Sequence, residues 1–98
     1  MKTLLLIANP SASGFTGAAL RDVEATLGEG YEVTTAWPNS PSESRQAAAD
    51  AAAEGYSVVA AMGGDGVIHH VANGLAFTGT SLGIIPTGTT NVVARLLG

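Results

Sequence analysis

The sequence predicts an α/β domain of three layers, in which a parallel β-sheet lies between helices. Short apolar segments alternate with helical segments of about 10–15 residues, which is typical of βαβ units with right-handed crossovers. Three of the four expected strands run directly into a loop rich in Gly, Ser or Thr that opens a helix. Strands one, three and four must be neighbours for these loops to converge, so the predicted strand order is 2-1-3-4. The length of 98 residues fits one small domain.

The first two strands and the helix between them follow from the hydrophobic pattern. Residues 4–8 are all apolar, as in a strand that is buried on both faces. Over residues 16–27 the apolar side chains fall on one helical face, and Gly28 ends the helix. Residues 31–37 alternate in polarity, which predicts a half-exposed strand that stops at Pro38.

Capping signals define the second helix. Ser40 and Glu43 form a predicted capping box, and Pro41 stands at the first helical position, where its missing N–H has no helical partner to lose. This helix is expected over residues 41–54. The mainly apolar segment 57–62 then predicts the third strand.

The last part of the chain is expected to hold two helices around a fourth strand. The third helix is expected over residues 67–76 and the fourth strand over residues 82–85. A final helix is expected to begin near Asn91 and to reach residue 98. Because this helix is short and apolar and lies beside an open strand edge, we expect a homodimer through this region, or fraying there.

Composition and charge exclude several classes of protein and site. The chain has no Cys, which excludes disulfides, thiolate metal sites and a Cys nucleophile. Its net charge of −4, with no basic cluster, argues against nucleic-acid binding. No apolar run approaches the roughly 20 residues of a transmembrane span. The apolar start ends at Asn9, short of the roughly 7–15 residues of a signal-peptide core, so we expect a cytoplasmic protein.

Three loops are expected at the carboxyl edge of the sheet, at residues 9–14, 63–66 and 86–91. Glycines let backbone N–H groups approach a ligand, helix N-termini favour anions, and hydroxyl groups add neutral donors. This combination predicts a nucleotide-phosphate site without basic side chains. It is not a Walker-type loop, because the only Lys is Lys2, nor a dinucleotide fingerprint, because His69 replaces the third Gly.

Asp65, Asn9 and Asn91 each admit two interpretations. A carboxylate in a phosphate loop either holds Mg²⁺ or accepts a proton from a nucleophile, whereas an Asp at a helix start is also a common N-cap. Asn9 and Asn91 lie where a loop meets a strand or a helix, and they are equally compatible with capping and with ligand contact.

The histidines and the large aromatic residues are expected to have structural roles. His69 and His70 point roughly 100° apart on a helix, so they do not converge on one ion. We expect His70 to be solvated and His69 to share a helical face with Asn73. Trp37 and Phe77 are expected to pack, although Trp37 stands at a strand end where it could border a pocket.

Three motifs resemble, in their order and spacing, the diacylglycerol kinase catalytic-domain family, which includes bacterial lipid kinases, sphingosine kinases and ceramide kinases. The segment GGDGVIHHVANGL at 63–75 resembles the family's GGDGT…V-x-NGL. The NP and SG pairs within residues 9–14 resemble its NP-x-SG loop. The segment PTGTTNVVARLLG at 86–98 resembles its P-x-GT-x-ND-x-AR-x-LG.

The resemblance implies that residues 1–98 are a single nucleotide-binding domain of a larger two-domain kinase, which phosphorylates a diacylglycerol-like lipid. ATP and Mg²⁺ are the implied cofactors. The second domain would reach the lipid acceptor, which implies a membrane-peripheral full-length protein, and this chain alone is expected to transfer no phosphate. Asp65 would lie near Mg²⁺ or the acceptor hydroxyl. The residues implied to bind the nucleotide are Asn9, Ser13, Gly14, Gly63, Gly64, Gly66, Gly88, Thr89 and Asn91.

Three departures from the family pattern bear on catalysis. Val67 stands where the family has Thr, His69 or His70 where it often has Glu, and Val92 where it usually has Asp. Two alternatives therefore stay open. One is a domain like that of the related NAD kinases, whose phosphate acceptor is a dinucleotide. The other is a non-catalytic nucleotide-binding module.

Overall fold

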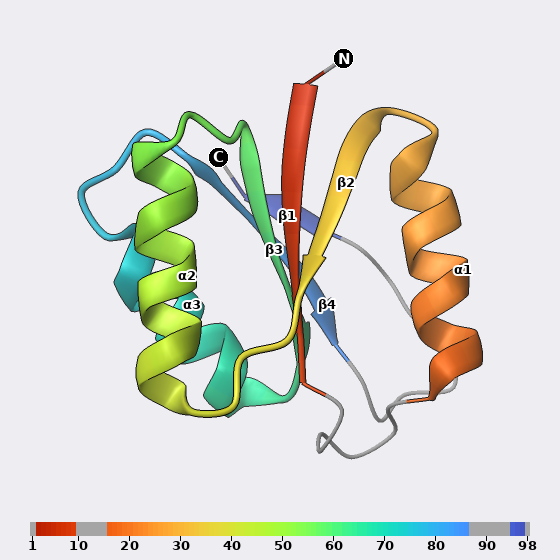
Figure 1. The fold of residues 1–98 in the computed structure, drawn as a ribbon, viewed down its shortest axis with the longest axis horizontal. Helices are drawn as coiled ribbons and strands as arrows, with labels where there is room; N and C mark the ends of the chain where they lie inside the picture. Colours follow the sequence, from red (N-terminus) through yellow and green to blue (C-terminus); the bar gives the residue numbers. More distant parts are fainter. Residues whose placement is uncertain (1, 10–15, 87–94, 98) are drawn as a thin grey trace.

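The computed structural model describes residues 2–9, 16–86 and 95–97, which form one sheet with helices on both of its faces (Figure 1). The elements, in chain order, are β1 (Lys2–Ala8), α1 (Gly17–Gly28), β2 (Tyr31–Ala36), α2 (Pro41–Ala53), β3 (Val58–Gly63), α3 (Asp65–Leu75), β4 (Ser81–Pro86) and β5 (Arg95–Leu97). From β1 to β4, every predicted strand and helix is present at close to its expected boundaries.

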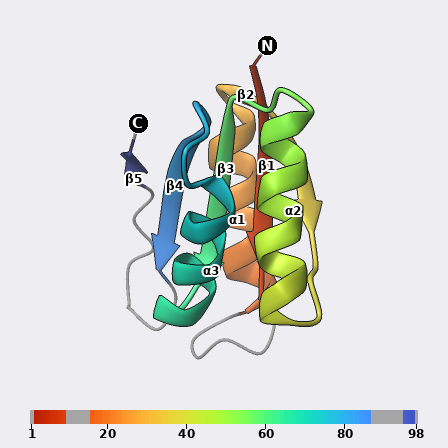
Figure 2. The same ribbon diagram turned by 90° about the vertical axis from the view of Figure 1, so that its left-hand side faces the viewer.

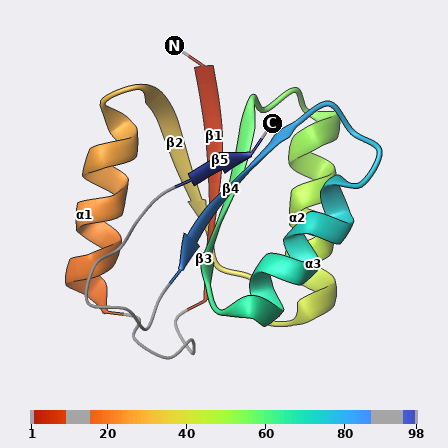
Figure 3. The same cartoon turned by 180° about the vertical axis from the view of Figure 1, so that it is seen from behind.

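The strand order in the sheet is β2-β1-β3-β4-β5. β1 pairs in parallel with β2 on one side, where Leu4 faces Val33, and with β3 on the other, where Leu4 faces Val58. β4 continues the parallel sheet beside β3. The predicted order 2-1-3-4 is therefore confirmed. It brings the carboxyl ends of β1, β3 and β4 to one edge of the sheet (Figure 3).

Different helices cover the two faces of the sheet: α1 lies on one face, and α2 and α3 lie on the other (Figure 2). Successive side chains of β1 point to opposite faces. Leu4, Leu6 and Ala8 pack in the cluster that contains α1, whereas Leu5 and Ile7 pack with α2 and α3. Since full burial of one Leu or Ile contributes roughly 1.5–3 kcal/mol, β1 stabilises both layers of the core.

Side-chain caps begin α1 and α2. Thr16 Oγ1 accepts a hydrogen bond from Ala19 N–H at 3.0 Å, and Ser40 Oγ accepts one from Glu43 N–H at 3.2 Å. The hydrogen bond from Glu43 N–H to Ser40 Oγ is one of the two bonds of a capping box, and it confirms that half of the prediction. In the other half, the Glu43 carboxylate accepts from the Ser40 hydroxyl, at 3.4 Å. The cap fixes the position where the chain turns from the carboxyl end of β2 into α2.

The prediction of a final helix is wrong where the structure describes that segment. Residues 95–97 form β5, which pairs antiparallel with β4, with Leu97 opposite Leu82 and Leu96 opposite Gly83. The open edge of β4 presents unpaired backbone N–H and C=O groups, which a strand satisfies and a short helix cannot. The start of the predicted helix, at Asn91, lies outside the described residues. The predicted homodimer, with fraying as its alternative, stays a prediction.

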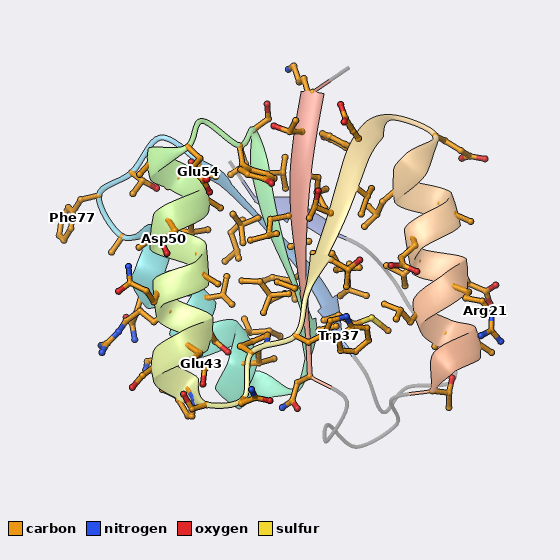
Figure 4. All side chains as sticks on the ribbon, viewed as in Figure 1. Arg21, Trp37, Glu43, Asp50, Glu54 and Phe77 are labelled. Carbon is orange, nitrogen blue, oxygen red and sulfur yellow. The ribbon has the colours of Figure 1, made fainter. Side chains whose placement is uncertain are left out.

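Phe77 does not pack, contrary to the sequence prediction. Its side chain is fully exposed and points away from the domain (Figure 4). It stands in a turn after α3, in which Thr78 N–H donates to the Leu75 carbonyl at 3.0 Å. Ala76 has φ −55° and ψ 133°, and Phe77 has φ 63°. These angles are those of a type II turn, and the position that Phe77 occupies in it favours Gly.

We expect Phe77→Gly to raise the free energy of unfolding by about 0.5–1 kcal/mol. The change removes the strain of a non-Gly residue in the left-handed backbone region, which is about 1–2 kcal/mol. Part of this gain is lost, because glycine increases the conformational entropy of the unfolded chain. Phe77→Ala is the matched control, because it removes the same exposed ring and keeps the strain. Urea denaturation measures the difference, and equal stability of the two variants would show that the turn is not strained.

Candidate functional site

The carboxyl ends of three parallel strands meet at one edge of the sheet. Ala8 pairs with Met62 at the end of β1, and Gly63 pairs with Pro86 at the end of β4. Asn9 N–H donates to the Met62 carbonyl at 3.3 Å, which continues the ladder by one residue. Two of the predicted site positions therefore lie side by side: Asn9 directly follows β1, and Gly63 is the last residue of β3. The predicted site residues Ser13, Gly14, Gly88, Thr89 and Asn91 lie outside the described part of the chain.

The first turn of α3 begins directly after β3. Gly64 is the N-cap, and it contributes no side-chain cap. The first hydrogen bond within the helix runs from Ile68 N–H to the Gly64 carbonyl at 3.3 Å. The N–H groups of the preceding residues have no partner within the helix, as at any helix start. Asp65 is the first helical residue, and it is not the N-cap.

A cavity of about 400 Å³ lies between the starts of α2 and α3 at this edge of the sheet. It joins two of the predicted site residues, Asn9 and Gly66, to the connection between β2 and α2. Of the described residues that line it, none is Glu, Lys or Arg. The lining residues are Asn9, Pro38, Asn39, Ser40, Pro41, Ser44, Gly66, Val67 and His70.

The contribution of the β2–α2 connection was missed by the sequence analysis, which assigned ligand loops only to the other three strands. The signal was the capping box at Ser40, because it places a helix N-terminus directly after the carboxyl end of β2. All parallel strands end at the same edge, so that helix start also faces the site. Trp37, which directly follows β2 (Figure 4), is 47% exposed. It borders a second, shallower hollow beside α2.

The two histidines of α3 occupy different surroundings. His70 is half-buried and lines the cavity, so it is less exposed than the sequence predicts. The cause is the approach of α2, which carries Ser40 and Ser44 to the side of α3 on which His70 lies. His69 is exposed, and its Nε2 lies 3.1 Å from Asn73 Nδ2, in agreement with their predicted shared face. The two rings meet edge to face, with centroids 5.4 Å apart.

Gly74 sets the distance between α2 and α3. A Cβ atom at this position would overlap the backbone carbonyl oxygen of Arg45 and would lie 2.9 Å from the Ala48 Cβ. The two helices therefore touch where α3 has no side chain.

A family model for the diacylglycerol kinase catalytic domain matches residues 3–98. The chain belongs to this family. It is 44% identical to a diacylglycerol kinase of Bacillus subtilis over 71 residues, which are 70% of the chain and 23% of that protein. Among solved structures, a diacylglycerol kinase from Bacillus anthracis superposes with a TM-score of 0.72 at 25% identity. That superposition covers 92% of this chain and 34% of the other.

This chain thus spans about a third or less of the length of these family members. A phosphate-loop protein solved in solution shares the fold, with a TM-score of 0.60 at 18% identity, over 92% of this chain and 81% of that one. The resemblance predicted from the three motifs is confirmed. Within the part of the chain that the structure describes, no helix is long and apolar enough to cross a membrane.

Proposed function

We propose that this chain is the ATP-binding domain of a lipid kinase, which transfers the γ-phosphate of ATP to the hydroxyl group of a diacylglycerol-like lipid. The observation that carries the proposal is the cavity beside the glycine segment at the start of α3, at the sheet edge where open α/β sheets bind ligands. Its lining of Asn, Ser, Pro and Val side chains suits a nucleobase, and the adjacent helix start suits phosphates.

The glycines at the start of α3 support phosphate binding there. Gly64 has φ −88°, which any residue adopts, so its backbone does not require Gly. A Cβ at Gly64 or at Gly66 would meet no other atom within 4 Å, so internal packing does not require Gly either. What the missing side chains provide is open space beside N–H groups that have no helical partner. A phosphate group fits that space and gains from the helix dipole.

The cavity supports binding of the nucleobase. Its volume of about 400 Å³ lies within the range of small-molecule sites, about 300–1,000 Å³. The rings of Pro38 and Pro41 and the side chain of Val67 supply apolar surface, and Asn39 and Ser44 supply polar groups. A neutral planar heterocycle fits such a lining better than a phosphate or a cation does.

Asp65 fits a role in holding Mg²⁺. This ion is held in phosphate-transfer sites by one or two carboxylates together with the phosphates of the substrate. Asp65 is the carboxylate of the segment 63–66, so it is the residue that would face an ATP-bound Mg²⁺ or accept the proton of the attacking hydroxyl. Mg²⁺ would neutralise charge that develops on the transferred phosphate.

The lipid acceptor is assigned to the rest of a longer kinase, since the chain covers only part of its relatives. On this proposal the active protein is cytoplasmic and works at the membrane surface as a peripheral enzyme. Transfer of labelled phosphate from ATP to diacylglycerol in mixed micelles, by a protein that carries this domain, tests the acceptor. Transfer to NAD instead would favour a NAD-kinase-like function, and binding without any transfer would favour a nucleotide-binding module.

We expect ATP to shift the backbone amide resonances of Gly63, Gly64 and Gly66 in an NMR titration of this 98-residue chain. The predicted site residues Gly88 and Thr89 are expected to shift with them. Affinity is expected to be weak, with a Kd on the order of 1 mM, or about −4 kcal/mol. Resonances at the opposite edge of the sheet, such as Gly30, serve as the internal control. Unmoved glycine amides at high ATP concentration would contradict the proposal.

A further inference from the structure

Ser44 is a buried polar residue in the first turns of α2. Its side chain is only 6% exposed, and among the described residues no other polar side chain is buried to this degree. It also lines the cavity between α2 and α3. The sequence analysis gave it no role, because it stands within a helix and belongs to none of the three motifs.

The hydroxyl of Ser44 has no hydrogen-bond partner among the described residues. The backbone N–H of Ser44 donates to the Ser40 carbonyl at 3.0 Å, which is the ordinary helical bond. A buried hydroxyl without a partner costs about 1–3 kcal/mol. Ser is also a weaker helix former than Ala. Folding alone therefore favours Ala at this position, and the hydroxyl is best explained by a ligand.

The surroundings of Ser44 indicate which ligand group it meets. A serine hydroxyl both donates and accepts, so it can bind a heterocycle edge on which an amino group lies beside a ring nitrogen. Among the described residues that line the cavity there is no Lys or Arg that would pair with a phosphate. Gly66, at the start of α3, lines the same cavity, so one nucleotide can reach both Ser44 and the glycine segment.

We propose that Ser44 is a specificity-determining residue, whose hydroxyl hydrogen-bonds the edge of the nucleobase. This proposal rests on the proposed function and assigns the base to the α2 side of the site. In the complex the base supplies the hydrogen-bond partner that the hydroxyl lacks among the described residues. Ser44 thus improves nucleotide binding and contributes nothing to folding, which separates its role from that of a structural core residue.

The test is an NMR titration of the 98-residue chain with adenosine, with ATP and with inorganic tripolyphosphate, together with a thermal melt. We expect Ser44→Ala to weaken adenosine and ATP binding about 3- to 10-fold, the effect of one lost hydrogen bond. Tripolyphosphate binding is expected to be unchanged, and the Tm to stay equal or rise. Ser42→Ala is the matched control, since Ser42 lies on the same helix, exposed and outside the cavity lining.

The outcomes separate this inference from the proposed function. If Ser44→Ala binds adenosine as tightly as the unchanged chain while ATP still shifts the glycine amides, the role of Ser44 is refuted and ATP binding stands. If ATP and adenosine both fail to bind the unchanged chain, both proposals fall. Ser44→Cys keeps the side-chain shape with a weaker donor, so it is expected to weaken adenosine binding as well, and unchanged binding would refute the role.

Discussion

Replacing Asp65 with asparagine is expected to lower the turnover of an active kinase that carries this domain by roughly 10²–10⁴-fold. The reason is that Asn keeps the shape of the side chain but can neither hold Mg²⁺ as a carboxylate nor accept a proton. The structure places the N-cap of α3 at Gly64 and Asp65 at the first helical position. The Tm is therefore expected to change little. Steady-state phosphate transfer and a thermal melt measure the two quantities.

Asp50→Asn is the matched control for this variant. Asp50 is an exposed carboxylate on α2, away from the start of that helix (Figure 4), and it accepts a hydrogen bond from Gln46 Nε2 at 2.8 Å. An asparagine can still accept that bond, so neither turnover nor Tm is expected to change. If Asp65→Asn keeps turnover within a few-fold of the unchanged protein, Asp65 has no catalytic or metal-binding role.

Gly74→Ala is expected to lower the free energy of unfolding by about 3 kcal/mol, at the upper end of typical overpacking effects. The added methyl group meets the backbone carbonyl oxygen of Arg45, which cannot move without a shift of α2. For a chain of this size, a loss of 3 kcal/mol corresponds to a decrease in Tm of roughly 12–24 °C. Because both helices form walls of the cavity, nucleotide binding is expected to weaken as well.

Gly28→Ala is the control for this prediction, because it makes the same change at the end of α1. A Cβ at Gly28 would meet no atom within 4 Å, so the variant is expected to be as stable as the unchanged chain or slightly more stable. Urea denaturation of the two variants provides the comparison. Equal stability of Gly74→Ala and Gly28→Ala would show that α2 and α3 do not meet at Gly74.

The strand order and the first three helices could be predicted because their signals are local. The apolar run at residues 4–8, the capping box at Ser40 and the glycines that close helices each act within a few residues. The meeting of the strand ends at one edge follows from parallel pairing alone, so the positions of Asn9 and Gly63 were also predictable.

The errors arose where distant contacts decide the structure. β5 forms because the edge of β4 is open, and its three residues carry no pattern that separates a strand from a short helix. Burial of Ser44 and His70 depends on the approach of α2 to α3, which Gly74 permits through its missing side chain. Phe77 is exposed because a turn geometry that favours glycine is occupied by a large residue.

A crystal structure of the chain with Mg²⁺ and a non-hydrolysable ATP analogue tests the central claim most directly. The account predicts that the base lies between α2 and α3, within hydrogen-bond distance of the Ser44 hydroxyl, and that the phosphates contact the backbone at Gly64 and Gly66. A nucleotide bound on the α1 face of the sheet, or one with its phosphates in the cavity and its base in solvent, would contradict it.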